Sequence, residues 1–104
     1  MRVIAYDRLR PGVTLDTVEP VLAEEVATAW QLWKEGVVRE NYQRADEPGA
    51  VLIFEVDSVE EARRHVAALP LTRAGYAEWF FVALRAPLML ETQFSDEALE
   101  RAGN

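Results

Sequence analysis

One carboxylate in this sequence stands where a helix would bury apolar side chains. Residues 20–35 predict a helix, and on a helical wheel Glu25 falls between Leu22 and Ala29, inside the apolar stripe. Burial penalises the charged form of a carboxyl group, so its pKa rises toward the range useful for a general acid or base. We therefore predict that Glu25 is catalytic, whereas its neighbour Glu24 lies outside the stripe and is solvated. The alternative is that Glu25 lies at the edge of the stripe, or pairs structurally with an arginine.

A second set of polar side chains comes from two segments that predict strands, residues 37–44 and 50–56. Glu55 is the only charged residue of the second segment. We expect Glu55 on the sheet face away from the helices, in a cavity that suits a polar or anionic substrate. The alternative is a cross-strand ion pair with an arginine and no chemical role. The predicted substrate-binding residues are Arg39, Tyr42, Glu55 and Tyr6.

The only histidine, His65, gives a weaker signal. It falls at the boundary of the apolar face of a helix predicted after Ser58, so it is expected to be a surface residue rather than a base or a haem ligand. A metal site is not expected, because the chain has no cysteine and no second histidine. No glycine-rich phosphate loop or nucleophile motif is present, so no bound cofactor is expected.

These side chains must be positioned by elements that alternate as β-α-β-β-α-β. The predicted strands are residues 2–7, 37–44, 50–56 and 76–85, with the third one central. The first helix is capped by Thr14 or Asp16, has a short turn over 15–19 before Pro20, and ends at Gly36. Ser58 caps the second helix, which ends near Leu69. The remaining segments are a loop over 71–75, an extended stretch over 87–94 and a polar tail over 95–104.

This order predicts one α+β domain of the ferredoxin-like type over residues 1–94, with both helices on one face of an antiparallel sheet. Strict alternation would divide the second strand into Arg39, Asn41 and Gln43 on one face and Val38, Glu40, Tyr42 and Arg44 on the other. The apolar stripe of the first helix comprises Val18, Leu22, Val26, Ala29, Leu32 and Trp33. The fourth strand carries large aromatic side chains on both faces, which favours burial of both and a second sheet as the cover.

Composition and charge exclude several classes of function. The chain has 104 residues with a net charge of -7, so it lacks the clustered basic residues that bind nucleic acid or anionic membranes. No apolar run approaches the roughly 20 residues that span a bilayer, and the N-terminus turns polar too soon for a signal peptide. We therefore expect a cytoplasmic protein that acts on a small molecule.

The stretch Glu25–Leu71 resembles the muconolactone isomerase family. The shared features are a glutamate eleven residues before a glycine, a basic and aromatic strand, a turn containing glycine, an acidic strand end and a second helix with matching boundaries. The residues that carry the resemblance are Glu25 with Trp33-Lys34-Glu35-Gly36, Val38-Arg39 with Tyr42 and Arg44, Phe54-Glu55-Val56-Asp57, Ser58-Val59-Glu60, and Leu69-Pro70-Leu71.

The resemblance implies a homodimer in which two sheets face each other as a dimeric α+β barrel, with larger assemblies possible. It also implies proton transfer between carbon atoms without a cofactor, with Glu25 as the residue that carries the proton. The family's isomerases have a His-Tyr pair where this chain has Gly49-Ala50. This departure implies a divergent branch rather than an enzyme for muconolactone itself.

We predict a small-molecule isomerase, or a related cyclase or lyase, that works by cofactor-free acid/base chemistry. Two alternatives stay open. One is a cofactor-independent mono-oxygenase of the same superfamily that acts on aromatic or polyketide-like substrates, which oxygen uptake would reveal. The other is a non-catalytic dimer that binds a small metabolite, in which Glu25 is ion-paired and the cavity is filled by Trp79 or Phe81.

Overall fold

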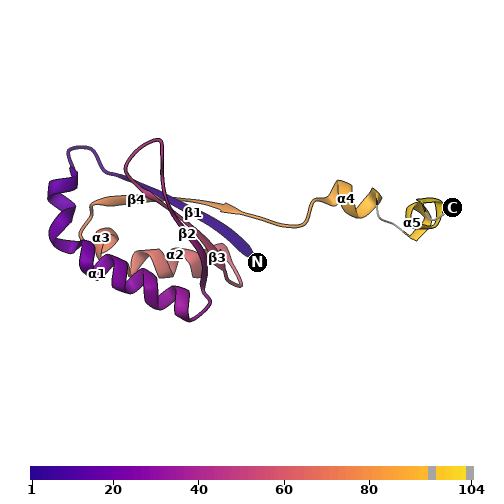
Figure 1. The fold of residues 1–104 in the computed structure, drawn as a ribbon, viewed down its shortest axis with the longest axis horizontal. Helices are drawn as coiled ribbons and strands as arrows, with labels where there is room; N and C mark the ends of the chain where they lie inside the picture. The colour runs from indigo at the N-terminus through magenta and orange to yellow at the C-terminus, as the bar shows by residue number, and fades with distance from the viewer. Residues whose placement is uncertain (94–95, 103–104) are drawn as a thin grey trace.

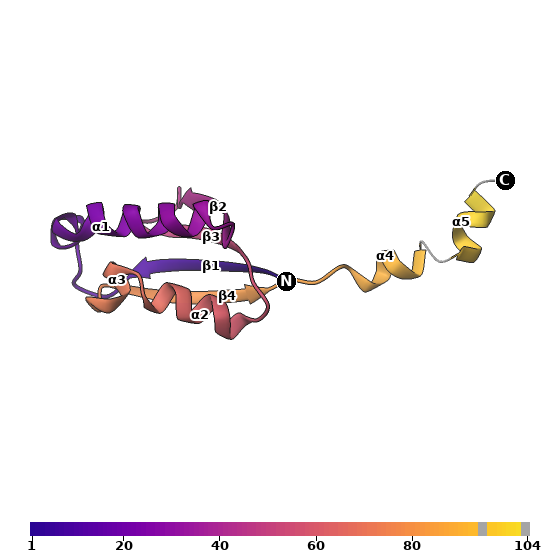
Figure 2. The same cartoon turned by 90° about the horizontal axis from the view of Figure 1, so that it is seen from below.

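Four antiparallel strands form one sheet, and the helices that connect them lie on one face of it. The computed structural model describes residues 1–93 and 96–102. The strand order is β2-β3-β1-β4, which confirms both the ferredoxin-like fold and the central place of the third strand. Figure 1 shows the helices below the sheet, and Figure 2 shows α1 along the β2–β3 side and α2 along the β4 side. The elements are β1 (Arg2–Leu9), α1 (Leu15–Lys34), β2 (Val38–Gln43), β3 (Ala50–Glu55), α2 (Val59–Ala67), α3 (Pro70–Arg73), β4 (Ala77–Ala83), α4 (Leu88–Gln93) and α5 (Asp96–Ala102).

The longest helix, α1, begins and ends at the predicted residues but is continuous. Thr14 Oγ1 accepts a hydrogen bond from the Thr17 N–H, and Gly36 follows the helix with a φ of 78° that only glycine adopts readily. The expected break before Pro20 is wrong, because the helix runs through this residue and changes direction in its first turns (Figure 1). Proline removes one backbone donor close to the helix start, which bends the helix without ending it. No helix in the described residues is long and apolar enough to cross a membrane.

A β-bulge in β2 changes which side chains face the helices. Val38 lies opposite Phe54, but the register shifts between Val38 and Glu40, so that Asn41 lies opposite Leu52. Val38, Phe54 and Leu52 are all buried under the helices. The expected strict alternation along β2 is therefore wrong at Arg39, where the extra residue puts Val38 on the same face as Asn41.

The segment after α2 is a short helix rather than the expected loop. α2 itself begins at its predicted cap, because Ser58 Oγ accepts a hydrogen bond from the Glu61 N–H over 3.1 Å. α3 then starts at Pro70, whose fixed φ suits the first position of a helix, and it buries Leu71 against α1 and β4. This short helix presents the Leu71 N–H toward α1.

Beyond β4 the chain leaves the sheet. The expected extended stretch over 87–94 is wrong for its described part, since α4 forms there from good helix formers after Pro87. Phe94, Ser95 and residues 103–104 lie outside the described residues. Figure 1 shows α4 and α5 projecting away from the body, so the sheet and its helices are complete at Ala83.

The core lies between the sheet and the helices. Its largest fully buried side chains are Phe54, Leu69, Val3, Val18 and Val38. The predicted stripe of α1 is only partly buried, because Val18 and Leu32 pack inward while Trp33 is 51% exposed. Trp33 stacks on Trp30 at the surface with ring centroids 4.9 Å apart, so its predicted place in the core is wrong. The helix is rotated so that Glu25, not Val26, lies closer to the interior.

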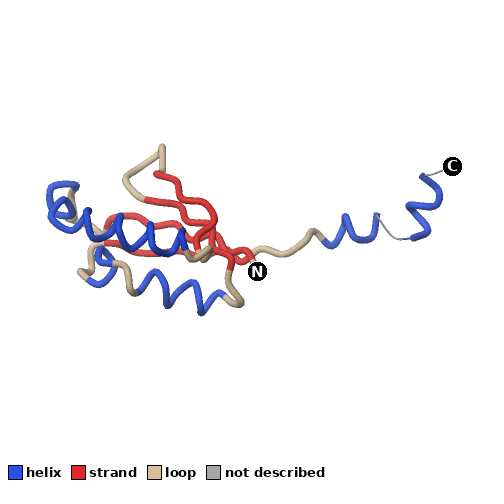
Figure 3. The backbone as a smooth tube through the Cα atoms, turned by 60° about the horizontal axis from the view of Figure 1, so that its bottom comes forward, coloured by secondary structure: helices blue, strands red, loops and turns tan. Residues whose placement is uncertain are grey.

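The other face of the sheet carries aromatic and basic side chains. Tyr6 stacks on Phe80 with ring centroids 5.3 Å apart, and the guanidinium groups of Arg44 and Arg8 lie over these two rings. Figure 3 shows that no helix covers this face. The predicted second sheet would come from another copy of the chain, so the homodimer stays a prediction.

The burial of each leucine predicts how much its side chain contributes to the free energy of unfolding. Leu69→Ala is expected to lower the free energy of unfolding by about 2–5 kcal/mol, because a 1% exposed side chain is replaced by a cavity. Leu15→Ala makes the same change at a 63% exposed side chain and is expected to cost only about 0.5 kcal/mol. Denaturant unfolding measures both values, and equal losses would contradict this placement of the core.

Candidate functional site

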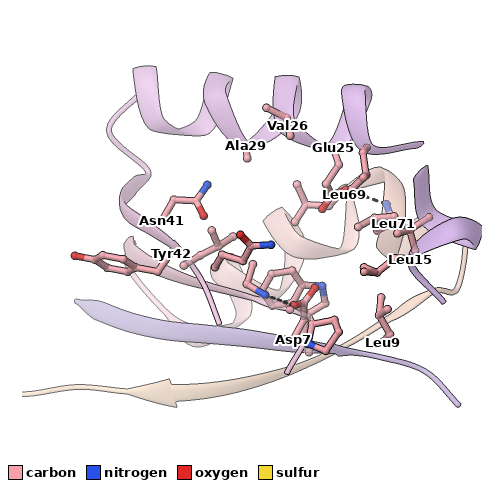
Figure 4. Close-up of a pocket in the computed structure, with 18 residues that line it drawn as sticks. Asp7, Leu9, Leu15, Glu25, Val26, Ala29, Asn41, Tyr42, Leu69 and Leu71 are labelled. Carbon is pink, nitrogen blue, oxygen red and sulfur yellow. Dashed lines mark hydrogen bonds between the residues drawn. The ribbon is translucent and has the colours of Figure 1, made fainter. Parts of the chain in front are cut away.

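A cavity of about 280 Å³ lies between α1 and the helix-facing side of the sheet (Figure 4). Its walls are mostly apolar, formed by side chains of α1, β1, β3, α3 and β4. We expected the site on the sheet face away from the helices, but this cavity lies on the helix-facing side. The polar residues that line it are Asp7, Glu25, Asn41, Tyr42 and Gln43.

Glu25 points from α1 into this cavity, as its place in the apolar stripe predicted (Figure 4). Its Oε2 accepts a hydrogen bond from the Leu71 N–H over 2.9 Å. Burial raises the pKa of Glu25, the Leu71 hydrogen bond and the charge of Arg73 lower it, and the charge of Asp7 raises it further. Within the described residues Glu25 has no ion-pair partner, so the alternative of a structural ion pair finds no support there.

Asp7, on β1, is the second carboxyl group of the cavity, and the sequence analysis missed it. Its side chain is 5% exposed, and Oδ1 accepts a hydrogen bond from the Ala50 N–H over 2.6 Å. Burial raises the pKa of Asp7, although the Ala50 hydrogen bond and the charge of Arg44 oppose the rise. A signal for it does exist in the sequence: Asp7 alternates with Val3 and Ala5, which face the helices.

Each carboxyl group uses one oxygen for structure and leaves the other available. The hydrogen bonds from Leu71 and Ala50 occupy Glu25 Oε2 and Asp7 Oδ1. Among the described residues, no other residue donates a hydrogen bond to the remaining oxygen of either group. Figure 4 shows Glu25 on the α1 wall and Asp7 on the β1 wall. A small molecule in the cavity would therefore meet a carboxyl oxygen from either side.

The β2–β3 hairpin holds Asp7 in place. Arg44 donates a hydrogen bond to the backbone carbonyl of Asp7 over 3.1 Å, and Gly49 comes so close that a Cβ there would overlap this carbonyl oxygen. The same Cβ would lie 3.0 Å from Asp7 Oδ1. Glycine at this position is thus required for the close approach that lets Ala50 donate to the carboxylate.

Trp79 forms one apolar wall and has a fixed orientation. Its indole N–H donates a hydrogen bond to Thr72 Oγ1 over 2.8 Å, which ties β4 to α3. The ring lines the cavity without filling it, so the filled cavity that the non-catalytic alternative requires is not seen here.

The other predicted site residues are not brought together. Tyr42 lines the cavity, but its phenol points away from Asp7 and Glu25 and donates a hydrogen bond to Glu40 (Figure 4). Tyr6 lies on the uncovered sheet face, stacked on Phe80.

Arg39 and Glu55 line a second, more open hollow near the N-terminus, away from the cavity. Glu55 pairs there with Arg2 of the neighbouring strand, Nε to Oε2, over 3.0 Å, and with the N-terminal amine. Glu55 thus forms the cross-strand ion pair that was the structural alternative.

His65 sits at the predicted boundary of α2. Its ring stacks on Phe54 with centroids 6.0 Å apart, and its Nε2 lies 3.8 Å from Glu61 Oε1. It does not line the cavity, so nothing in its placement gives it a chemical role.

The fold and this cavity can be compared with known proteins. The chain is similar to the structure of 5-chloro-2-hydroxyhydroquinone dehydrochlorinase (TftG) from Burkholderia phenoliruptrix AC1100 in complex with 2,5-dihydroxybenzoquinone, with a TM-score of 0.68 and 22% identity over 86% of this chain and 98% of that one. It is also similar to muconolactone isomerase, with a TM-score of 0.66 and 24% identity over 84% and 92% of the two chains. No family model and no curated protein matches the sequence. The likeness confirms the ferredoxin-like α+β fold of the single chain.

The close approach at Gly49 is testable. Gly49→Ala is expected to lower the free energy of unfolding by about 1–3 kcal/mol, because the hairpin must move away from Asp7. It should also shift the carboxyl-carbon NMR signal of Asp7. The control is Gly12→Ala, whose Cβ would meet no atom within 4 Å and should leave that signal in place. An unchanged Asp7 signal in Gly49→Ala would contradict this account of the hairpin.

Proposed function

We propose that this protein catalyses acid/base proton transfer on a small ring-shaped molecule bound between α1 and the sheet. The reaction is an isomerisation, or a related cyclisation or elimination, and the protein is an isomerase-like enzyme. The observation that carries the proposal is the pair of carboxyl groups, the buried Asp7 and the half-buried Glu25, on two walls of one cavity. Burial raises the pKa of both groups, which moves each one toward the range useful for proton transfer.

Glu25 is the proposed proton shuttle. Its carboxylate removes a proton from a carbon next to a carbonyl group, and the resulting carboxylic acid returns the proton to a different carbon. The double bond moves between these steps, and no atom is gained or lost overall. The hydrogen bond from Leu71 holds Oε2 and leaves Oε1 for the transfer.

Asp7 is the proposed partner of Glu25. Asp7 is the more deeply buried of the two, and burial raises its pKa; when protonated, it would donate a hydrogen bond to the substrate's carbonyl oxygen. Negative charge develops on that oxygen when the proton leaves the carbon, and a donor aimed at it lowers the barrier. The mutual repulsion of the two carboxylates also favours a state in which one of them is protonated.

The names of the two similar structures support this class of chemistry. One is an isomerase, the other a dehydrochlorinase crystallised with a quinone, and both names describe small ring-shaped substrates. Isomerisation and elimination both begin when a base removes a proton from the substrate. The pocket of this chain offers a base for that step, while the reaction that follows depends on the substrate.

A matched pair of glutamates on α1 tests the proposal. α-Angelica lactone, whose double bond moves into conjugation by a proton shift, is incubated with the protein in deuterium oxide and followed by proton NMR. Glu25→Gln is expected to lower the rate of isomerisation and deuterium uptake by about 10²–10⁴-fold, because the amide keeps the shape but carries no proton. Glu24→Gln, one residue away and exposed, should match the unchanged protein.

Circular dichroism and thermal unfolding serve as the control that Glu25→Gln is folded. Proton transfer at the unchanged rate in a folded Glu25→Gln protein would contradict the role of Glu25. Oxygen consumption with a phenolic substrate, unaffected by Glu25→Gln, would favour the mono-oxygenase instead.

A further inference from the structure

We propose that the cavity selects uncharged molecules that carry hydroxyl or carbonyl groups and discriminates against carboxylates. The proposal rests on the proposed function for the choice of site, and it adds the substrate class. It reverses the expectation of an anionic substrate, which depended on Arg39 facing the site. Arg39 lies at the second hollow instead.

The charges on the cavity wall are all acidic. Asp7 and Glu25 line the cavity, whereas no arginine, lysine or histidine among the described residues does so. A bound carboxylate would therefore stand next to two carboxyl groups with no cation to offset its charge. Proteins that bind small anions usually provide a guanidinium, an ammonium or several backbone N–H groups for that purpose.

The two arginines whose charges act on Asp7 and Glu25 do not line the cavity. Arg44 reaches the carbonyl of Asp7, but its guanidinium is already engaged by Asp46, over 2.7 and 3.0 Å, and by Glu47, over 2.9 Å. Arg73 influences Glu25 through its charge, yet it does not line the cavity and forms no ion pair with Glu25. Neither arginine therefore adds its charge to the cavity wall.

Neutral polar groups supply the recognition. Asn41 and Gln43, brought to the helix-facing side of β2 by the bulge, line the cavity, and Asn41 points into it (Figure 4). An amide both donates and accepts hydrogen bonds, so it pairs equally well with a hydroxyl or a carbonyl group. With a free carboxyl oxygen on Asp7 and on Glu25, the site has polar partners for two oxygen atoms of one ligand.

The apolar part of the cavity wall limits the size and shape of the ligand. Leu9, Val18, Leu52, Leu71 and Trp79 present apolar surface to the ligand. A volume of about 280 Å³ lies at the small end of the range for ligand pockets. One ring with a few substituents fits this description better than a large or strongly charged molecule.

Two ligands of equal size and different charge test the proposal on the full chain. 4-Hydroxybenzamide and 4-hydroxybenzoate differ only in that an uncharged amide replaces a carboxylate. Their dissociation constants are measured at neutral pH by NMR titration, with the indole N–H signal of Trp79 reporting on the cavity. The amide is expected to bind at least roughly ten-fold more tightly, because the carboxylate of the other ligand is repelled by the acidic groups of the wall.

The source of the preference is tested with the same pair of glutamates. Glu25→Gln is expected to reduce the ratio of the two dissociation constants, and Glu24→Gln is expected to leave this ratio unchanged. Equal or tighter binding of 4-hydroxybenzoate, or a difference that Glu25→Gln leaves intact, overturns the proposal. So does the failure of both ligands to shift the Trp79 signal at millimolar concentration.

These outcomes are separate from those of the proposed function. A preference for the amide without any proton transfer in the lactone assay would leave the substrate class standing and remove the enzymatic role. Proton transfer that occurs only with ligands carrying a carboxylate would leave the enzymatic role standing and remove the substrate class.

Discussion

The burial of two carboxyl groups under α1 is the constraint on which the site depends. A carboxylate removed from water is unstable unless it is hydrogen-bonded or protonated. This fold gives each of them one backbone N–H donor, Leu71 at the start of α3 for Glu25 and Ala50 at the start of β3 for Asp7. The short helix that begins at Pro70 and the tight hairpin at Gly49 thus have the same effect, because each brings a backbone N–H donor to a carboxyl group of the cavity.

Among the described residues, neither carboxyl group has an ion-pair partner, and this leaves both able to take part in proton transfer. A partner arginine for either one would have lowered its pKa. Glu55 does have such a partner and forms a structural ion pair with Arg2 at the other hollow. Single amide donors leave the pKa of both groups raised and one oxygen of each unoccupied. The absence of a basic residue on the described cavity wall then sets the charge of the ligand as well as the state of the acids.

Periodicity and turn residues were enough to predict the fold and the inward position of Glu25. The caps at Thr14 and Ser58, the hairpin and the strand order followed from local patterns that the tertiary structure respects. The bulge in β2 was not predictable, because one inserted residue reverses the faces without changing the composition of the strand. Asp7 was overlooked because a polar residue near a strand end is usually solvated, and only the approach of Gly49 encloses it.

The most direct test of the account is an NMR titration of the side-chain carboxyl carbons of Asp7 and Glu25 in the unmodified protein and in Asp7→Asn. The account predicts pKa values above the usual 3.8 and 4.5 for both groups, with burial as the main cause. It also predicts a lower pKa for Glu25 in Asp7→Asn, because the neighbouring charge is gone. Ordinary or depressed values, or a Glu25 pKa that ignores the loss of Asp7, would show that these two acids do not form one site.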